Sequence, residues 1–439
     1  MYIDQKTLQD LSIFHRSGGV YHLINQCTTL GGAAWLKQYM AQPPADYNKL
    51  LQVQSAIRYW SRHHEEWCGN INNGTMLMVD KFYSSSETII NKPTAVSLMV
   101  DKIIRHLIPN NEQSLLKFSI TQVMEFVKGC HYLAIQHLHR DTPEYLREIL
   151  AEMKSMLEAE LPARLVTTSI EAPFKVLMTL SYYTRKNLKS TIAHLVRLFE
   201  KIDALRGMAI AGLKRDWVFP ELLPEAPSVF HVKGLYHPLL ENPVAYDVSF
   251  SGEKNFMFLT GANMSGKSTL IRSMGICAYL AHLGLAVPAR QARISFLHGI
   301  ITNMQIEDNI YKGESYFYAE VQRIKNTAIQ ISGTHYNLVL MDELFKGTNV
   351  HDAYECTQAV IRSLVQSKTD MMALSTHLYE IGGRFASVPN IQFRYCETVM
   401  NEDGTFAFTY QLKEGVSNDR IGYLVLKNEG VLDILEKLK

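Results

Sequence analysis

Hydrophobic residues recur at steps of three and four through the first half of the chain, which is the period of an amphipathic α-helix. The apolar stripes are Leu50, Val53, Ile57 and Trp60 in segment 44–60, and Leu146, Ile149, Met153 and Leu157 in segment 142–162. Asp46 precedes the first stripe and is placed to cap the start of its helix. Residues 1 to about 215 are therefore expected to be helical.

The longest helical pattern covers about 175–215. Its stripe consists of Ile192, Leu195, Phe199, Ile202, Leu205 and Ala209. No proline interrupts the segment between Pro173 and Pro220. The pattern predicts one helix of lever length, because forty helical residues would extend about 60 Å.

The pattern changes after a proline-rich stretch at 219–227, which is the best domain boundary. Short β-like runs follow at 228–232, 245–250, 255–259, 292–301, 337–341, 371–376, 391–399 and 405–412. The last two flank "NEDG" and are typical of a hairpin. Strands that alternate with helical runs indicate an α/β domain. The predicted fold class is α + α/β, with an all-helical domain at 1–220 and an α/β domain at 225–439.

The sequence "TGANMSGKST" (260–269) lies between a strand-like run and a helix-like run. Gly261, Gly266, Lys267 and Ser268 satisfy G-x-x-x-x-G-K-[ST], a loop whose backbone N–H groups wrap a phosphate. Lys267 would reach the β- and γ-phosphates, and the Ser268 hydroxyl would ligate Mg²⁺. An ordinary glycine-rich turn is the alternative, and the strand and helix on either side favour the phosphate loop.

Two further runs end in polar groups. Asp342 and Glu343 follow an apolar strand, where Asp342 would hold Mg²⁺ through water and Glu343 would polarise the attacking water. His377 follows another strand and could sense the γ-phosphate from the edge of the sheet. Without the phosphate loop, these groups would be ordinary solvated residues at strand ends.

Ser315 stands at the start of a helical pattern and is a natural N-cap. The other interpretation is that Ser315 presents donors to a phosphate. In that case, a second subunit would have to bring Ser315 to the nucleotide.

Composition narrows the class of protein. The formal charge is +1, so DNA contacts would have to come from local patches such as Arg185, Lys186 and Lys189. The six cysteines form no C-x-x-C pair, which argues against zinc and against a disulfide framework. The N-terminus has no apolar signal region, and Met274 to Pro288 is too short to cross a bilayer. We expect a cytoplasmic protein with no membrane partner.

In order, these motifs resemble those of the MutS family of DNA mismatch repair ATPases, a branch of the ABC superfamily. "TGANMSGKST" resembles TGPNMGGKST, "ESYFYAEV" resembles STFxxEM, "LVLMDELFKGTNVHDA" resembles LVLxDEIGRGTSTxDG, and "LSTHLYEI" resembles ATHYxEL. Weaker similarity to the family's core region covers 1–60, and 199–222 resembles the lever helix that leads into the ATPase.

The resemblance implies a role for each matching residue. Phosphates and Mg²⁺ would be bound by Gly261, Ala262, Asn263, Met264, Ser265, Gly266, Lys267, Ser268 and Thr269, with Ser268 and Asp342 serving the metal. Glu343 would activate water, His377 would be the switch histidine, and Ser315 would act in trans. The base of ATP would lie over 242–246, with Val244 as its contact and Tyr246 a departure from the family's Asn. ATP and Mg²⁺ are the expected cofactors of a homodimer formed through the ATPase domains.

Departures from the family pattern limit the functional interpretation. We expect the mismatch-reading and connector domains to be absent, and the short segment 160–174 stands where the family inserts a clamp domain. "LFKGT" replaces IGRGT, and "NMQIEDN" stands in place of RIGASD.

Three functions remain open. The first is a MutS-like ATPase on DNA, a mismatch repair homologue with repair-protein partners. The expected absence of the mismatch-reading domain argues against mismatch specificity. The second is an ABC-type ATPase that acts on a protein or on branched nucleic acid. The third is a nucleotide-dependent scaffold with little turnover, which intact Lys267, Asp342 and Glu343 disfavour. The missing LSGGQ-type signature and the long helical half argue against a transporter subunit.

Overall fold

The computed structural model describes residues 1–84, 110–304, 316–333, 336–400, 406–417, 426 and 430–436. The chain divides into two compact units. The helical unit contains 24–42 and 52–211, and the C-terminal unit contains 1–23, 43–51 and 212–439. This grouping places two N-terminal segments with the C-terminal unit, whereas the sequence-based division separates 1–220 from 225–439. That division into domains stays a prediction.

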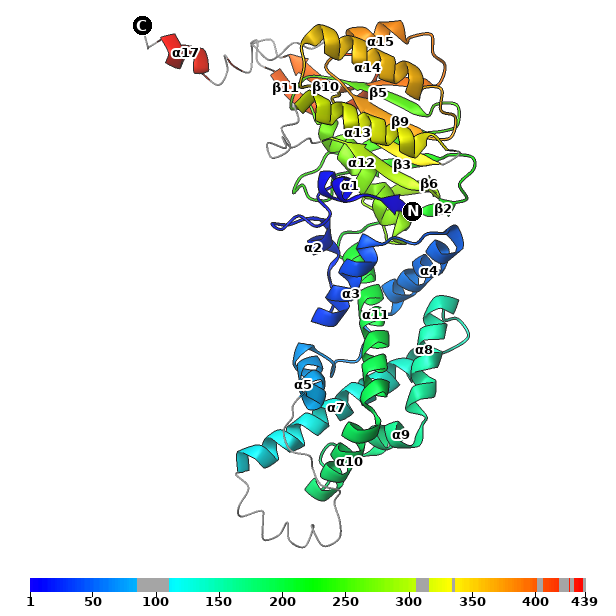
Figure 1. Ribbon diagram of the computed structural model, residues 1–439, viewed down its shortest axis with the longest axis vertical. Helices are drawn as coiled ribbons and strands as arrows, with labels where there is room; N and C mark the ends of the chain where they lie inside the picture. Colours follow the sequence, from blue (N-terminus) through cyan, green and yellow to red (C-terminus); the bar gives the residue numbers. More distant parts are fainter. Residues whose placement is uncertain are drawn as a thin grey trace. The chain divides into compact units, whose positions relative to one another are not determined.

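The helical unit is built from amphipathic helices. Their bounds are α3 Leu30–Ala41, α5 Asn73–Ser84, α7 Asn110–His137, α8 Glu144–Leu157, α9 Glu160–Thr167 and α10 Phe174–Asn187, with most of α4 Tyr47–His63 and α11 Lys189–Leu213 (Figure 1). Helix α7 contacts α5, α8, α9 and α10. The stripes predicted for 44–60 and 142–162 are buried. Asp46 also caps α4 as predicted, since its Oδ1 accepts from the Lys49 N–H at 2.8 Å.

The single helix predicted for about 175–215 is wrong, because the segment folds as two helices. Helix α10 ends at Asn187, and Leu188 leaves helical geometry with φ −112° and ψ 8°. Neither proline nor glycine marks the break. The Leu188 side chain is buried at the break. Because a buried leucine also fits the apolar period of a helix, the sequence pattern does not reveal where α10 ends.

A buried carboxylate fixes the start of α3 within the helical unit. Asp203 of α11 accepts hydrogen bonds from the backbone N–H groups of Thr28 and Thr29 at 2.8 Å each, and from the Thr29 hydroxyl at 2.7 Å. Thr29 in turn caps α3 by accepting from the Gly32 N–H. These bonds satisfy donors that a helix N-terminus leaves free.

The C-terminal unit contains two sheets. The larger has the order β1-β7-β8-β9-β5-β10-β11, and the smaller has the order β2-β6-β3-β4. The strands of the larger sheet are β1 Tyr2–Ile3, β5 Phe256–Thr260, β7 Gly299–Asn303, β8 Asn337–Asp342, β9 Met371–Ser375, β10 Ile391–Met400 and β11 Phe406–Glu414. Those of the smaller are β2 Glu221–Leu223, β3 Phe230–Leu235, β4 Tyr246–Phe250 and β6 Gln291–Ser295. Among the described strands of the larger sheet, only β11 runs antiparallel to its neighbour.

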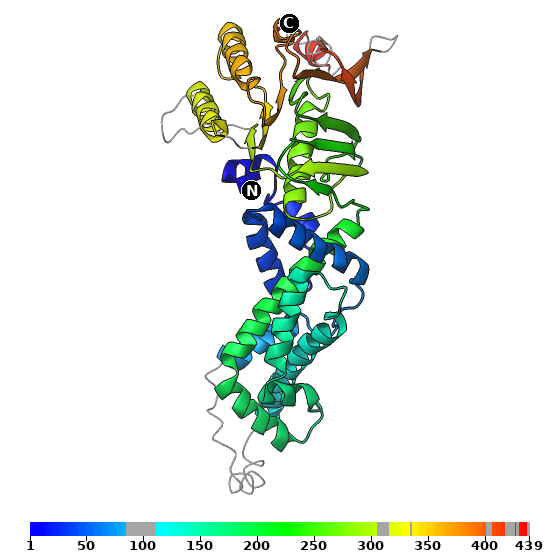
Figure 2. The same ribbon diagram turned by 90° about the vertical axis from the view of Figure 1, so that its right-hand side faces the viewer.

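Helices cover both faces of the larger sheet. Helix α12 (Lys267–His282) contacts β7, β8 and β9 of that sheet and β3 of the smaller one. Helices α13 (Tyr316–Ile331) and α14 (Val350–Leu364) lie on the side away from α12 (Figure 2). Short helices α1 Gln5–Asp10, α2 Val20–Ile24, α15 Glu380–Arg384 and α17 Val431–Glu436 complete the described elements.

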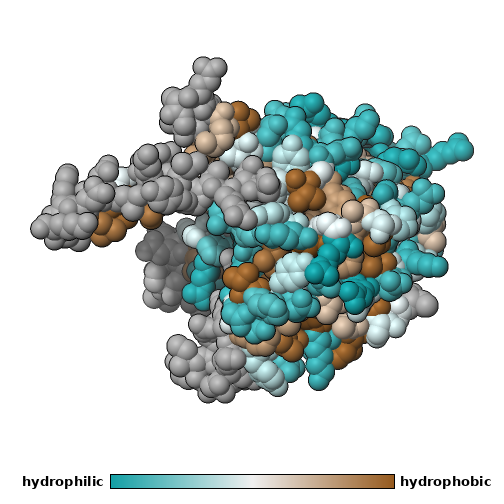
Figure 3. All heavy atoms as spheres, turned by 90° about the horizontal axis from the view of Figure 1, so that it is seen from above, coloured by the Kyte–Doolittle hydropathy of each residue, from teal (hydrophilic) through white to brown (hydrophobic). Residues whose placement is uncertain are grey.

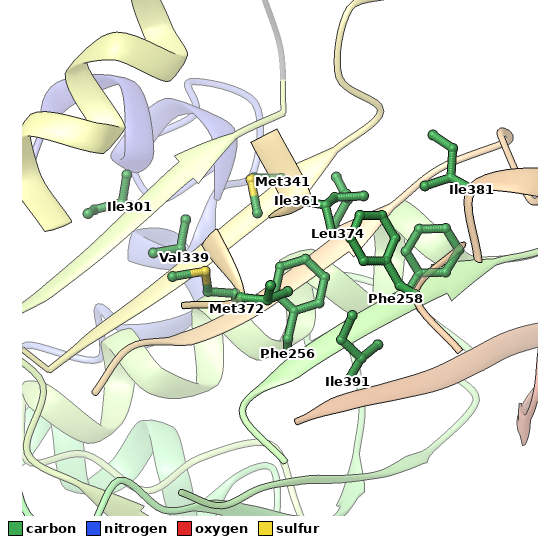
Figure 4. Close-up of a cluster of buried hydrophobic side chains, with 12 residues drawn as sticks. Phe256, Phe258, Ile301, Val339, Met341, Ile361, Met372, Leu374, Ile381 and Ile391 are labelled. Atoms are coloured by element: carbon green, nitrogen blue, oxygen red, sulfur yellow. The ribbon is translucent and has the colours of Figure 1, made fainter. Parts of the chain in front are cut away.

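A cluster of buried side chains holds α14 and α15 on the sheet. It consists of Phe256, Phe258, Ile301, Val339, Met341, Ile361, Val365, Met372, Leu374, Ile381, Phe385 and Ile391 (Figure 4). Strands β5, β8 and β9 are buried along their whole length, as expected for a parallel sheet covered on both faces.

Each β-like run of the sequence overlaps a strand, so the predicted α/β class is confirmed. The run 292–301 is split between β6 and β7, which belong to different sheets. The predicted hairpin is confirmed by the antiparallel pairing of β10 with β11. Its turn residues, 401–405, lie outside the described residues.

An unpredicted feature is the anchoring of the N-terminus. Strand β1 pairs in parallel with β7 at the edge of the larger sheet. The Asp10 carboxylate forms a buried ion pair with Arg323 of α13 and accepts from the Thr302 hydroxyl at 2.6 Å. The Arg323 guanidinium also donates to the Thr302 carbonyl at 2.9 Å.

No described helix combines the length and the apolar character needed to cross a membrane. On the face shown in Figure 3, hydrophobic residues are scattered among hydrophilic ones.

We predict that Asp10→Asn lowers the free energy of unfolding by about 3–5 kcal/mol, because it removes a carboxylate that pairs with the buried Arg323 guanidinium. The measurement is urea unfolding followed by circular dichroism. The matched control is Glu221→Gln, which breaks the exposed 2.8 Å pair with Arg293 and is expected to cost less than about 1 kcal/mol. Equal effects of the two substitutions would contradict the prediction.

Candidate functional site

The loop between β5 and α12 depends on unusual backbone angles. Gly261 has φ +134° and Gly266 has φ +101°, both of which side chains rarely adopt. A Cβ at Gly261 would lie 2.8 Å from the Cys396 carbonyl oxygen, which is too close. Gly266 is the N-cap of α12 and offers no side chain to that helix. The first N–H groups of α12 are therefore not capped by a side chain at that position.

Lys267 points back into this loop. Its Nζ donates to the carbonyl oxygens of Gly261 and Ala262 at 2.9 Å each and lies 3.5 Å from His377 Nε2. The residue is buried, and burial lowers its pKa from the ordinary value, while the charge of Glu343 opposes that shift. A buried ammonium held by carbonyl oxygens, rather than by a carboxylate in direct contact, is suited to an anion that enters the loop.

Strand order brings the other predicted groups to the same edge. Strand β9 lies between β8 and β5, and Ser375 pairs in register with both Asp342 and Leu259. The buried Asp342 carboxylate accepts a hydrogen bond from the Ser375 hydroxyl. The carboxyl ends of these parallel strands therefore place Asp342 close to the loop that follows β5.

Glu343 follows the end of β8 and is held by two side chains. Its Oε1 lies 2.7 Å from His377 Nε2, and its Oε2 lies 3.0 Å from Lys346 Nζ. Burial acts to raise the pKa of this carboxyl, but hydrogen bonds and charge from His377 and Lys346 outweigh it and lower the pKa to about 2. Glu343 is therefore ionised near neutral pH. Its φ of +57° is rare for a side-chain-bearing residue.

A cavity of about 490 Å³ opens beside the loop. It is lined by His237, Leu240, Glu241, Asn242, Val244, Tyr246, Asn263, Met264, Gly266, Lys267, Ser268, Thr269, Glu343 and Tyr410. The volume falls in the range of small-molecule sites. The structure therefore brings together, around one cavity, groups that come from four separate parts of the sequence.

The predicted site residues take different places. Val244, Asn263, Met264, Gly266, Lys267, Ser268, Thr269 and Glu343 line the cavity, while Gly261, Ala262, Ser265 and Asp342 are buried next to it. His377 contacts Glu343. Ser315 lies outside the described residues, as does most of "NMQIEDN". The functional roles of all these residues stay predictions.

Sequence reasoning did not assign Tyr410 and His237 to the site. Tyr410 comes from β11, has φ +54°, and would lie 3.2 Å from a Cβ at Gly266 through its Cδ1 atom. Burial and the charge of Arg272 lower the pKa of His237 to about 4, so its imidazole is neutral near pH 7. The segment "GLYHPLL" around His237 could have pointed to the site, but no local signal marks Tyr410 because only the sheet order brings it here.

The residues present fit a nucleoside triphosphate with Mg²⁺. Gly266 lines the cavity, and a Cβ at this position would lie 3.1 Å from Tyr246 Oη and narrow the cavity. Helix N–H groups and Lys267 are suited to phosphate, and the Ser268 hydroxyl and the Asp342 carboxylate supply the oxygen ligands that Mg²⁺ prefers.

Parts of the chain are similar to known proteins. Residues 257–436 match the family model described as MutS domain V. The chain is 30% identical over 243 residues to "DNA mismatch repair protein msh3" of Aspergillus fumigatus, covering 53% of this chain and 21% of that protein.

Two further relatives extend the comparison. The chain is 29% identical over 252 residues to "DNA mismatch repair protein MutS" of Thermotoga maritima, covering 56% of this chain and 31% of that protein. "DNA mismatch repair protein MSH7" of Arabidopsis thaliana is 23% identical over 485 residues, covering 98% of this chain and 43% of that protein. The chain thus spans between 21% and 43% of the length of these relatives.

We predict that Gly261→Ala destabilises the fold by about 1–3 kcal/mol, because alanine at this φ is strained and its Cβ meets the Cys396 carbonyl. Urea unfolding measures the effect. The control is Gly252→Ala, where nothing lies within 4 Å of the added Cβ and φ is not positive. A Gly261 variant as stable as the Gly252 variant would show that the loop tolerates other backbone angles.

Proposed function

The chain belongs to the MutS family, and on that premise we propose that it is a magnesium-dependent ATPase that acts on DNA as a dimer. One observation carries the enzymatic part of the proposal. An ionised Glu343 follows a buried Asp342 at the end of β8 and faces the same cavity as the loop of Lys267.

The chain's own groups divide the work of hydrolysis. The α12 N–H groups and the Lys267 ammonium bind the phosphates and draw negative charge off the γ-phosphate. Glu343 accepts a hydrogen bond from the attacking water and orients it. His377 and Lys346, which hold Glu343 at 2.7 and 3.0 Å, keep that carboxylate ionised and fixed.

Ser268 and Asp342 would hold Mg²⁺, which when bound neutralises charge on the β- and γ-phosphates. Val244, Tyr246 and Tyr410 line the same cavity and would contact the nucleoside. Adenine recognition by Val244 in particular rests on the resemblance to the family.

We further propose that hydrolysis requires a second copy of the chain. The proposal rests on Ser315, which resembles the family's serine that contacts the γ-phosphate across the dimer. Helix α13 begins at Tyr316, so Ser315 directly precedes it in the chain. A homodimer through the C-terminal units is the simplest arrangement, and a related chain could take the place of the second copy.

DNA is the proposed target because the relatives are DNA mismatch repair proteins by name. Arg185 and Lys186 lie in the last turn of α10, and Lys189 begins α11, so basic residues gather where these helices meet. Such side chains supply salt-dependent phosphate contacts. Specific reading of mismatches is not part of the proposal, and the protein is expected to work in the cytoplasm with repair-protein partners.

We predict that Glu343→Gln retains ATP but lowers kcat by about 10²–10⁴-fold, because the amide cannot serve as a base. Lys267→Ala is expected to lose ATP binding. Phosphate release and equilibrium binding of ATP measure the two effects, and sedimentation with ATP reports the dimer. Unchanged hydrolysis in the Glu343 variant would remove the proposed base, and a wild-type protein that neither binds ATP nor pairs would overturn the proposal.

For the DNA target, we predict binding of a labelled duplex that weakens as salt rises and that depends on ATP. The same assay should include a mismatched duplex and a four-way junction at two salt concentrations. The triple charge variant Arg185→Gln, Lys186→Gln, Lys189→Gln should bind all three more weakly, with a smaller salt slope. Absence of binding to every DNA would instead favour a protein target.

A further inference from the structure

The loop after Glu343 is strained and needs support. Glu343 and Phe345 both have positive φ, at +57° and +59°, although neither is glycine. Such a residue is less stable than the same residue in a favoured conformation. Two of them within three residues persist only if neighbouring groups hold the segment in place.

The support comes from Glu320 of α13. This carboxylate is buried, and its two oxygens accept from two successive backbone N–H groups, Oε1 from Lys346 and Oε2 from Gly347, at 3.1 Å each. Both oxygens of one buried anion are thus used on the backbone of the 345–347 segment. Charge-assisted hydrogen bonds of this kind are stronger than neutral ones.

A ring contact joins the same two elements a second time. Phe317, in the first turn of α13, lies against Phe345 with ring centroids 5.9 Å apart. The start of α13 and the segment after Glu343 are therefore connected by a hydrophobic contact and by two hydrogen bonds. Because interfaces of this kind are packed, a shift of one element is passed to the other.

The connection leads directly to the candidate base. The backbone that Glu320 holds carries the Lys346 side chain, whose Nζ lies 3.0 Å from Glu343 Oε2. The opposite oxygen of Glu343 is taken by His377. Loss of the Glu320 contacts would free the 345–347 backbone and remove one of the two side chains that orient Glu343.

We propose that Glu320 is a positioning residue for Glu343, acting through the 345–347 backbone and Lys346, so that α13 and the base move as one body. The inference rests on the proposed ATPase function. It gives α13 a role beyond covering the sheet, because any contact at the start of this helix, including one from a second copy of the chain, reaches Glu343 through Glu320.

Glu320→Gln tests the proposal, because the amide keeps one acceptor oxygen and turns an NH₂ donor toward the other N–H. We expect kcat to fall at least tenfold while the KM for ATP and the binding of ATP change less than twofold. Lys346→Met should also lower kcat. The double variant should be no slower than Glu320→Gln alone, within twofold, since both changes break one connection.

Hydrogen exchange supplies a readout that needs no turnover. In Glu320→Gln, peptides covering 344–349 should exchange at least tenfold faster, whereas those covering 260–269 should be unchanged. The control is Glu221→Gln, which removes a carboxylate paired with Arg293 of β6 rather than with α13 and should leave exchange at 344–349 unchanged.

Unchanged kcat and exchange in Glu320→Gln, or single effects that multiply in the double variant, would overturn the proposal. Should Glu320→Gln fail to fold, Lys346→Met tests the proposal in its place. The Lys346 side chain is partly exposed and can be replaced without disturbing the core. A kcat of Lys346→Met equal to that of the wild type would contradict the proposal. A wild-type protein without turnover would refute the ATPase function separately, and the exchange measurement would still test the connection.

Discussion

The candidate site depends on the order of three parallel strands. Because β8, β9 and β5 are neighbours that run in the same direction, their carboxyl ends meet at one edge and deliver Asp342, His377 and the phosphate loop to the same place. The strands are buried throughout, so the edge is rigid. This rigidity allows an ammonium at Lys267 and a carboxylate at Glu343 to face one cavity with few side-chain motions left to restrict.

The sequence predicted the parts of this arrangement that are local. The loop could be predicted from the spacing of its two glycines, whose positive φ few other residues adopt. The strands could be predicted from continuous apolar runs. The pairing of Glu343 with Lys346 is local in sequence, but it occurs in a loop whose positive φ at Glu343 and Phe345 is not marked by glycine. The pairing of Glu343 with His377 could not be predicted, since it depends on distances across strands. Tyr410 and Glu320 could not be assigned a role for the same reason: each reaches the site through register or packing, which leaves no periodic signal in the chain.

The helical unit shows the same limit in another form. Apolar stripes predicted its helices, but the break at Leu188 divides what the pattern indicated as one helix. The stripe from Ile192 to Ala209 lies within α11, and α10 buries a face of its own that includes Leu177 and Leu180. Periodicity indicates which side of a helix is buried. It does not indicate where a helix ends if the last residue is a buried leucine rather than proline or glycine.

The first residues of the chain complete the sheet on which the site is built. Strand β1 pairs with the outer edge of β7. The Asp10 carboxylate pairs with the buried guanidinium of Arg323, which comes from α13. A polypeptide cut to begin at residue 212 would keep every residue that lines the cavity, yet it would expose the edge of β7 and remove the Asp10 carboxylate from the buried Arg323 guanidinium. Sequence contiguity is thus a poor guide to what can be excised: the smallest autonomous version of the proposed ATPase must be assembled from segments at both ends of this chain.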